Sequence, residues 1–482
     1  MRAAFTRGTL LHFAILLAVA VLLRCDTFGD PNVHGDEVFY HQVGIAMHHG
    51  AWPYVDVWDR KPFGLFALFW LITAVSEAPI AYQLAATLFA AATAWVIGRI
   101  AERWAGPRGA LLAGLCYLLW LAPLQGQGGQ SPVFYNLFVA TAALLVLDAL
   151  PRLRAGERPR SVMAAMLLGG CAITLKTTSF VEGAFLGLVS LAALQRSGLA
   201  SRQVLGTGAL WALLGLAPTL AIAAAYWLGG HWPEYWHAMV TANLAKPPYW
   251  PDVRIHLVLM AIMLAPVFVA AVLGLREQES RSRRFVLLWL AAAVLGLAVM
   301  PNFYIHYALP LLVPLCVAAS SFLARGGVGV AFTALLAALS LWFSPIFQFT
   351  ATARSVRAIA DLAATTRAHL GGGPLLVYDG PPQLYHLTGQ PFATPLVFPT
   401  HLSQGIEKDV SHLSTLGETR RVLAERPGAV VMAVEPSNSP ANLETRRPVL
   451  AYVGQNCRLI RVIDVPERVR SQFMAVWGDC RR

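Results

Sequence analysis

Residues 34–62 read HGDEVFYHQVGIAMHHGAWPYVDVWDRKP and form the first long polar stretch of the chain. This polar loop lies between two apolar segments. It begins with the adjacent carboxylates Asp36 and Glu37 and ends with the cation Lys61. A carboxylate can remove a proton and a cation can stabilise a departing anion, so these groups suit acid–base chemistry. The polar loop is therefore the first candidate site.

The composition is that of a membrane protein. Apolar residues make up 56% of the chain, charged residues only 13%, and the mean hydropathy is +0.55, whereas soluble domains carry about 25% charged residues. The formal net charge of +11 would suggest a nucleic-acid partner in a soluble chain. Here most arginines lie in short loops between apolar segments, which membrane orientation explains better. We expect a lipid bilayer as the environment and no nucleic-acid partner.

Eleven apolar stretches are candidate membrane spans, although several are shorter than the roughly 20 residues that cross a bilayer. They are residues 9–23, 79–98, 109–124, 131–150, 161–175, 179–194, 203–228, 255–275, 285–300, 307–323 and 328–347. Residues 63–76 are also apolar but short, and counting them as a span would place the arginines of the next loop outside. We expect a re-entrant or surface-lying helix there, with a twelfth span as the alternative.

The arginines set the orientation of the predicted spans. If the chain crosses the membrane eleven times, most of its loop arginines fall on one side. These are Arg2 and Arg7, the arginines of loops 99–108, 152–160, 196–202 and 276–284, and Arg325. The positive-inside rule makes that side the cytoplasm. The first span has the basic start of a signal peptide but no clean cleavage site, which indicates a retained signal anchor. We expect a multi-pass protein with a cytoplasmic N-terminus and a periplasmic C-terminal domain.

The composition becomes more polar and proline-rich after residue 348. We expect a transmembrane domain over residues 1–348, which includes an outer loop at 24–78, and a soluble α/β domain over 349–482. Its predicted elements are a helix at 353–370 and strands at 374–378, 429–434, 459–465 and 473–477. Cys457 and Cys480 flank the last two strands. They would form a disulfide in an oxidising compartment, and otherwise remain free thiols.

The chain has only four lysines, Lys61, Lys176, Lys246 and Lys408. All four fall on the predicted outer side, where the positive-inside rule disfavours them in short loops. A lipid phosphate would explain cations at Lys61, Lys176 and Lys246. The alternative for Lys176 and Lys246 is a snorkelling side chain at the membrane surface.

Several motifs together resemble one superfamily. The first polar loop carries Gly35-Asp36-Glu37 with Tyr40, Gly50-Ala51-Trp52-Pro53-Tyr54-Val55-Asp56 and Trp58-Asp59-Arg60-Lys61-Pro62; far downstream lies Asn302-Phe303-Tyr304-Ile305-His306-Tyr307, followed by Leu309-Pro310 and Val313-Pro314. This layout resembles the GT-C superfamily of integral membrane glycosyltransferases. It is most similar to the bacterial branch related to protein O-mannosyltransferases and to the aminoarabinose and galacturonic acid transferases of lipid A and core oligosaccharide. Phe63 stands where that group has a second proline.

The resemblance implies a multi-spanning α-helical fold of the GT-C type and a function. Members take a sugar from a polyprenyl-phosphate carrier and transfer it, usually with inversion, on the outer face of the membrane. We therefore expect a hexosyl- or pentosyltransferase of the bacterial inner membrane that needs no cofactor. Its partners would be a polyprenyl-phosphate-linked sugar and an envelope glycolipid, glycan or protein acceptor.

The resemblance also implies roles for individual residues. Asp36 and Glu37 are the expected catalytic pair, at the start of a helix that runs to about His49, where the helix dipole keeps Asp36 ionised as a general base. The expected ligands of the donor phosphate are Lys61, Lys176, Tyr304, His306 and Tyr307. The expected acceptor or sugar ligands are His34, Tyr40, His41, Asp56 and Asp59.

Two alternatives concern the chemistry of the loop. Asp36 could simply cap the helix. Asp36, Glu37 and His34, with His41, could also hold a divalent metal that neutralises the phosphate. A third alternative concerns the whole chain, because eleven spans also suit a transporter or flippase of an anionic lipid-linked substrate. The lack of inverted repeats argues against transport.

Overall fold

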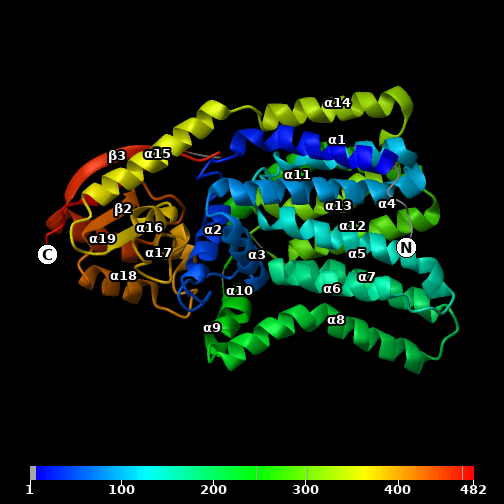
Figure 1. The fold of residues 1–482 in the computed structure, drawn as a ribbon, viewed down its shortest axis with the longest axis horizontal. Coiled ribbons are helices and arrows are strands. Elements are labelled where there is room, and N and C mark those ends of the chain that lie inside the picture. Colours follow the sequence, from blue (N-terminus) through cyan, green and yellow to red (C-terminus); the bar gives the residue numbers. More distant parts are fainter. Residues whose placement is uncertain (1–6, 246, 301, 469–470, 482) are drawn as a thin grey trace. The chain divides into compact units, whose positions relative to one another are not determined.

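The computed structural model describes residues 7–245, 247–300, 302–468 and 471–481, and the chain forms two compact units. The helical unit comprises Met1–Asp26, Leu84–Ile222 and Tyr249–Phe347. The mixed unit comprises Thr27–Gln83, Ala223–Pro248 and Gln348–Arg482 (Figure 1). Each unit is therefore assembled from segments far apart in the sequence.

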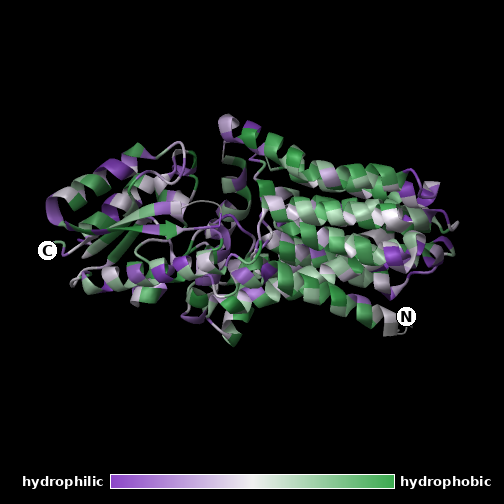
Figure 2. Cartoon of the chain, turned by 90° about the horizontal axis from the view of Figure 1, so that it is seen from above, coloured by the Kyte–Doolittle hydropathy of each residue, from purple (hydrophilic) through white to green (hydrophobic). Residues whose placement is uncertain are grey.

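Long apolar helices make up the helical unit, and Figure 2 shows them as largely hydrophobic. They are α1 (Arg7–Arg24), α4 (Pro79–Leu121), α5 (Ser131–Arg154), α6 (Arg160–Leu175), α7 (Phe180–Gln195), α8 (Ser201–Leu228), α11 (Trp250–Leu275), α12 (Ser280–Ala298), α13 (Leu312–Leu323) and α14 (Gly326–Phe343). In the described part of the chain, eight helical segments are long and apolar enough to cross a membrane. Each of the eleven predicted stretches falls on a helix, because α4 carries two of them. The number of spans stays a prediction.

The helix α4 is a hairpin of two helical arms. Its backbone turns at Gly106, where φ is +63° and a side chain would be strained. A Cβ atom at Gly98 would lie 2.8 Å from the carbonyl oxygen of Ala110, and one at Gly114 would lie 2.8 Å from that of Ala94. The two glycines therefore let the arms approach backbone to backbone, as small residues do between membrane helices.

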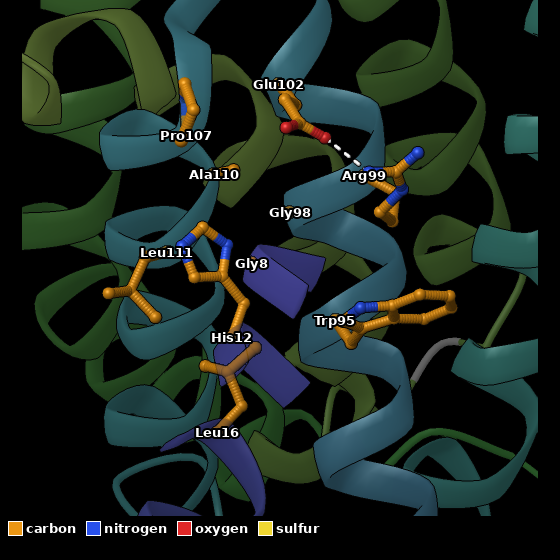
Figure 3. Close-up of a pocket in the computed structure, with 10 residues that line it drawn as sticks. All are labelled: Gly8, His12, Leu16, Trp95, Gly98, Arg99, Glu102, Pro107, Ala110 and Leu111. Carbon is orange, nitrogen blue, oxygen red and sulfur yellow. Dashed lines mark hydrogen bonds and ion pairs between the residues drawn. The ribbon is translucent and has the colours of Figure 1, made fainter. Parts of the chain in front are cut away.

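A cavity of about 170 Å³ lies near this turn (Figure 3). His12 and Leu16 reach it from α1, and Trp95, Arg99 and Glu102 reach it from the first arm of α4. An ion pair of 2.6 Å joins Arg99 Nη1 to Glu102 Oε2. None of the residues that the sequence analysis singled out for function lines this cavity.

A four-stranded sheet organises the mixed unit. Its strands are β1 (Leu375–Asp379), β2 (Ala429–Ala433), β3 (Arg458–Pro466) and β4 (Ser471–Gly478), in the spatial order β1-β2-β4-β3. The pair β1 and β2 is parallel, whereas β4 is antiparallel to both β2 and β3. The accompanying helices are α15 (Phe349–Ala368), α16 (Gln383–Thr388), α17 (Pro399–Ser403), α18 (Thr415–Ala424) and α19 (Leu443–Asn456). The predicted helix and all four predicted strands of a small α/β fold are confirmed.

The first polar loop folds together with the C-terminal part of the chain. It contains α2 (Gly35–His48) and is followed directly by α3 (Phe63–Val75). Trp58 is 1% exposed and packs in the core that contains Leu376 and Met432 of the sheet. Buried Asp30 accepts a hydrogen bond of 2.6 Å from Ser355 Oγ, and its carboxylate lies 3.5 Å from Arg468 Nε. The sequence analysis assigned the loop to the transmembrane domain, whereas the structure groups Thr27–Gln83 with Gln348–Arg482.

Residues 63–76, for which the sequence allows either a re-entrant or surface-lying helix or a twelfth span, contain the helix α3. Its 13 residues span about 20 Å at 1.5 Å per residue, less than the roughly 30 Å of a hydrocarbon core. It packs closely on α2, since a Cβ atom at Gly44 would lie 2.8 Å from the backbone of Phe69. The length favours a helix that does not span, which stays a prediction.

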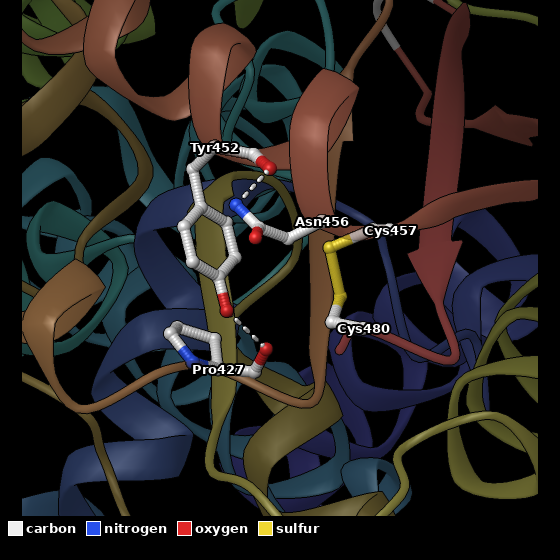
Figure 4. Close-up of a disulfide and its surroundings, with 5 residues drawn as sticks. All are labelled: Pro427, Tyr452, Asn456, Cys457 and Cys480. Carbon is white, nitrogen blue, oxygen red and sulfur yellow. Dashed lines mark hydrogen bonds between the residues drawn. A yellow bond between two sulfur atoms is a disulfide. The ribbon is translucent and has the colours of Figure 1, made fainter. Parts of the chain in front are cut away.

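Cys457 and Cys480 are joined as a disulfide (Figure 4). The bond joins Cys457, the first residue after α19, to Cys480, the second residue after β4. Neighbouring hydrogen bonds hold the same corner, because Tyr452 Oη donates to the Pro427 carbonyl at 2.8 Å and Asn456 Nδ2 donates to the Tyr452 carbonyl at 2.9 Å. The other four cysteines, Cys25, Cys116, Cys171 and Cys316, are free.

Removal of this disulfide is expected to destabilise the mixed unit. The cross-link separates its cysteines by 23 positions, and closing a loop of that size is worth about 2–4 kcal/mol. Cys457→Ser should therefore lower the melting temperature, while Cys25→Ser should leave it unchanged. Thiol alkylation of the denatured, unreduced protein should label four cysteines; labelling of six would exclude the disulfide.

Candidate active site

The start of α2 positions the first predicted catalytic residue. His34 is the N-cap, and its Nδ1 accepts a hydrogen bond of 3.2 Å from the backbone N–H of Asp36. Asp36 therefore lies in the first helical turn and is not the capping residue. An anion is favoured at this position by the partial positive charge of the helix N-terminus. The side chain of Asp36 is 13% exposed, so it remains accessible from solvent.

Lys61 joins Asp36 to a second carboxylate from the far end of the loop. Its Nζ lies 3.3 Å from Asp36 Oδ1 and 3.4 Å from Asp59 Oδ1. Asp59 is 2% exposed and also accepts the Lys61 backbone N–H at 3.0 Å. Two carboxylates from opposite ends of the loop therefore meet at one ammonium, and Asp36 is the more exposed of the two.

Aromatic rings and a strained turn fix the position of Lys61. Its Nζ lies 5.4 Å from the ring centre of Tyr40 and 5.2 Å from that of Phe398, distances at which a cation is attracted to a ring face. The Tyr54 hydroxyl donates to the Lys61 carbonyl at 2.8 Å. Tyr54 is fully buried with φ +73°, an uncommon conformation for a residue with a side chain. The turn is therefore held by its surroundings.

The C-terminal segment contributes a residue that the sequence analysis did not single out. His401 of α17 is 2% exposed, and its Nε2 lies 3.6 Å from Asp59 Oδ2. Burial lowers the pKa of His401 to about 4, against the opposing effects of Asp59 and Glu407. The imidazole is therefore neutral at physiological pH. No motif marked His401, because 342 residues separate it from Asp59 and only the folded chain brings them together.

Arg60 makes the second link between the loop and the C-terminal segment. Its Nη2 lies 2.8 Å from Oε1 of Glu407, which is 2% exposed. The backbone N–H of Trp58 donates to the Pro395 carbonyl at 2.9 Å, and the Trp58 ring lies 4.7 Å from that of His401. Three consecutive loop residues thus contact the C-terminal segment directly before Lys61.

Not every predicted ligand joins this cluster. Asp56 is exposed and closes a turn by accepting the Trp52 backbone N–H at 2.7 Å. Glu37 is completely buried one residue along from Asp36, and His41 lines a separate cavity. Successive residues of a helix are 100° apart, so Asp36 and Glu37 lie on different faces. Of the predicted metal set, His34 and Asp36 lie together, with His34 Nδ1 3.9 Å from Asp36 Oδ2, whereas Glu37 and His41 do not join them. A metal at this position stays a prediction, and the cation beside Asp36 in the structure is the Lys61 ammonium.

The helical unit brings together the predicted phosphate ligands that lie far apart in its sequence. Lys176 follows α6 and is 9% exposed. Its Nζ lies 4.5 Å from the ring centre of Tyr307. Tyr304 and His306 stack with their ring centres 5.9 Å apart, and the rings of His306 and Tyr307 meet edge to face at 4.8 Å. One cation and three polar rings thus form a second cluster.

Lys246 lies outside the described residues. Glu182 of α7 is 4% exposed within a candidate span, and Trp289 Nε1 donates to its Oε1 at 2.8 Å. The only sequence signal for Glu182 is an acidic residue inside an apolar segment, which is a functional candidate by default.

The helical unit and the small mixed sheet have a fold that is also found in solved structures of membrane proteins. The chain is similar to ArnT from Cupriavidus metallidurans in a crystal structure bound to undecaprenyl phosphate, with a TM-score of 0.62, 16% identity and coverage of 98% of both chains. Apo ArnT from the same organism gives 0.62 and 16%, over 97% of both chains.

A weaker likeness is to the cryo-EM structure of the arabinosyltransferase EmbB from Mycobacterium smegmatis. It has a TM-score of 0.47 and 16% identity, and covers 76% of this chain and 33% of that chain. No family model and no curated protein matches the chain. The likeness to ArnT therefore establishes the fold alone.

Acid is expected to destabilise the mixed unit through His401. Its folded pKa of about 4 is below the 6.5 of an exposed histidine, so the unfolded chain takes up the proton first as the pH falls. Stability is then lost progressively from pH 6.5 towards 4, by about 1–2 kcal/mol between pH 6.5 and 5. His401→Gln, neutral throughout, should flatten the melting temperature measured across this range. An identical pH slope in the variant would contradict the assignment.

Proposed function

We propose that the protein is an inverting glycosyltransferase that uses a polyprenyl-phosphate-linked sugar on the periplasmic face of the bacterial inner membrane. The acceptor is a lipid, polysaccharide or protein of the cell envelope. The observation that carries the proposal is the carboxylate of Asp36, held at a helix N-terminus and 3.3 Å from Lys61, in a chain with the ArnT fold. That ArnT binds undecaprenyl phosphate in its crystal structure supports a lipid-phosphate donor.

Asp36 is the proposed general base. Its carboxylate removes the proton of an acceptor hydroxyl while the oxygen attacks the anomeric carbon from the face opposite the phosphate. The new glycosidic bond forms as the bond between the sugar and the phosphate breaks, and the electron pair leaves with the polyprenyl phosphate. Asp59 has a positioning role, because it is buried and contacts Lys61 rather than solvent.

The proposed ligands of the departing phosphate are the residues that the sequence indicates for this role. Lys61, Lys176 and the rings of Tyr304, His306 and Tyr307 offer cationic or neutral hydrogen-bond donors, which stabilise the charge that develops on a leaving phosphate. Lys61 already interacts with two carboxylates, whereas Lys176 lies against the Tyr307 ring. We therefore assign Lys176 to binding of the donor in the ground state. We assign Lys61 to stabilising the charge that develops on the leaving phosphate.

Asp36→Asn is expected to lower the rate of transfer about 10²-fold or more, because an amide cannot accept the proton. The measurement is transfer of radiolabel from polyprenyl-phosphate sugars to an envelope fraction by the purified full-length protein. Asp361→Asn is a matched control, since Asp361 is exposed and pairs with Arg461 at 3.8 Å. Full transfer by a well-folded Asp36→Asn protein would overturn the role of Asp36.

The two lysines are expected to separate kinetically. Lys176→Met should raise KM for the donor about tenfold or more, because it removes a charge that binds the phosphate in the ground state. Lys61→Met should lower kcat, because removing one donor to a developing anion costs about 10²–10³-fold. Lys176→Arg keeps the charge and is the matched control. A donor KM that is the same in Lys176→Met and the wild type would contradict its assignment.

A further inference from the structure

The cavity of about 170 Å³ near the turn of α4 lies wholly within the helical unit (Figure 3). It is smaller than the roughly 300–1,000 Å³ of sites that enclose a whole small molecule. Its lining comes from three helical segments, which are the start of α1 and the two arms of α4. A cavity of this size suits one polar group of a larger ligand.

The lining from α1 leads from the end of the helix into a candidate membrane span. It consists of Gly8, His12 and Leu16, which are spaced by four residues and so share one face of the helix. Gly8 precedes the candidate span, which begins at Leu10. Leu16 lies eight residues after Gly8, about 12 Å further along the helix axis. One end of the cavity is therefore close to the membrane surface, and the other end lies deeper.

The first arm of α4 runs antiparallel to α1. The rings of Phe13 and Trp95 meet edge to face with their centres 6.2 Å apart. Further along α1, Arg24 Nε donates to Thr87 Oγ1 at 3.1 Å. The start of α1 therefore lies beside the part of this arm that approaches the turn at Gly106.

The charged groups of the lining lie at the surface end. Arg99 and Glu102 form an ion pair of 2.6 Å, and their side chains are 29% and 36% exposed, so both remain accessible. Trp95 lies one helical turn deeper on the same arm, and the second arm adds Ala110 and Leu111. The cavity thus combines a pair of opposite charges near the surface with an apolar wall that leads into the membrane.

The charges of this pair cancel, which decides the charge of the ligand. Neither Arg103 nor Arg108 lines the cavity, and Arg103 pairs with Asp148. An anionic head group would bring a second negative charge beside Glu102, and like charges at close range repel. A zwitterion carries one charge for each member of the Arg99–Glu102 pair.

The hydrogen-bonding groups narrow the choice of zwitterion. A guanidinium matches the geometry of a phosphate, and a carboxylate accepts hydrogen bonds from a primary ammonium. A trimethylammonium group has no proton to donate. The lining therefore fits phosphoethanolamine better than phosphocholine.

We propose that this cavity binds the phosphoethanolamine head group of a membrane phospholipid on the predicted cytoplasmic side. The phosphate binds at Arg99 and the ammonium at Glu102, while the glycerol and the first part of the acyl chains follow the apolar wall past Trp95 and Leu16. The bound lipid joins α1 to the hairpin of α4. The site does not depend on the proposed transfer reaction.

Native mass spectrometry of the full-length protein, titrated with dioleoyl lipids, tests the proposal. Phosphatidylethanolamine should bind about tenfold or more tightly than phosphatidylcholine or phosphatidylglycerol. Arg99→Gln should weaken this binding about tenfold or more, because a charge-assisted hydrogen bond to the phosphate is lost. Glu102→Gln leaves the cation of Arg99 unbalanced, so its preference should change to phosphatidylglycerol.

Matched variants control for general effects on lipid binding. Arg152→Gln removes the cation of an equally short ion pair outside the cavity, 2.6 Å from Glu157, and should bind like the wild type. Leu111→Trp should abolish the preference by filling the cavity, whereas Leu10→Trp, at a position 52% exposed to the outside, should retain it.

Three results would overturn the proposal. The first is equal binding of the three lipids by the wild type. The second is a preference for phosphatidylethanolamine that survives in Glu102→Gln or in Leu111→Trp. The third is binding of soluble glycerophosphoethanolamine as tight as that of the lipid, which would exclude the membrane as the source.

Discussion

Lys61 is the group on which the geometry of the proposed reaction centre depends. A single ammonium lies within 3.4 Å of two carboxylates that are 23 positions apart in the sequence. Asp59 is almost fully buried, so removing the cation would leave a buried charge with one fewer partner, which costs about 3–5 kcal/mol in comparable pairs. Asp36 is more exposed and keeps access to solvent. The same cation therefore stabilises a buried carboxylate and positions an accessible one.

This arrangement requires the first polar loop and the C-terminal segment to fold as one unit. Arg60 pairs with Glu407, Asp59 contacts His401, and the Trp58 ring packs in the core beneath the sheet. Each contact is buried, so neither partner can be exchanged for an unmatched group without a cost in desolvation. Along the loop, Trp58 and Arg60, which contact the C-terminal segment, alternate with Asp59 and Lys61, which belong to the cluster around the ammonium. The C-terminal segment thus takes part in holding the centre, beyond any role in choosing an acceptor.

Local patterns predicted the elements well, because periodicity and turn residues are local properties. The helix that begins beside Asp36 and the four strands after residue 374 follow directly from such patterns. The contacts between segments could not be predicted in this way. His401 stands in an ordinary short helix, and nothing in its sequence neighbourhood indicates Asp59. The hairpin of α4 depends on two glycines that look like any others in an apolar segment.

The separation of two environments around α2 follows from helical geometry alone. Asp36 and Tyr40 repeat at four residues and lie beside Lys61, whereas His41 and Gln42 line a separate cavity. One helix can therefore contribute Asp36 to the proposed reaction centre and His41 to a cavity on its other face without the two environments mixing.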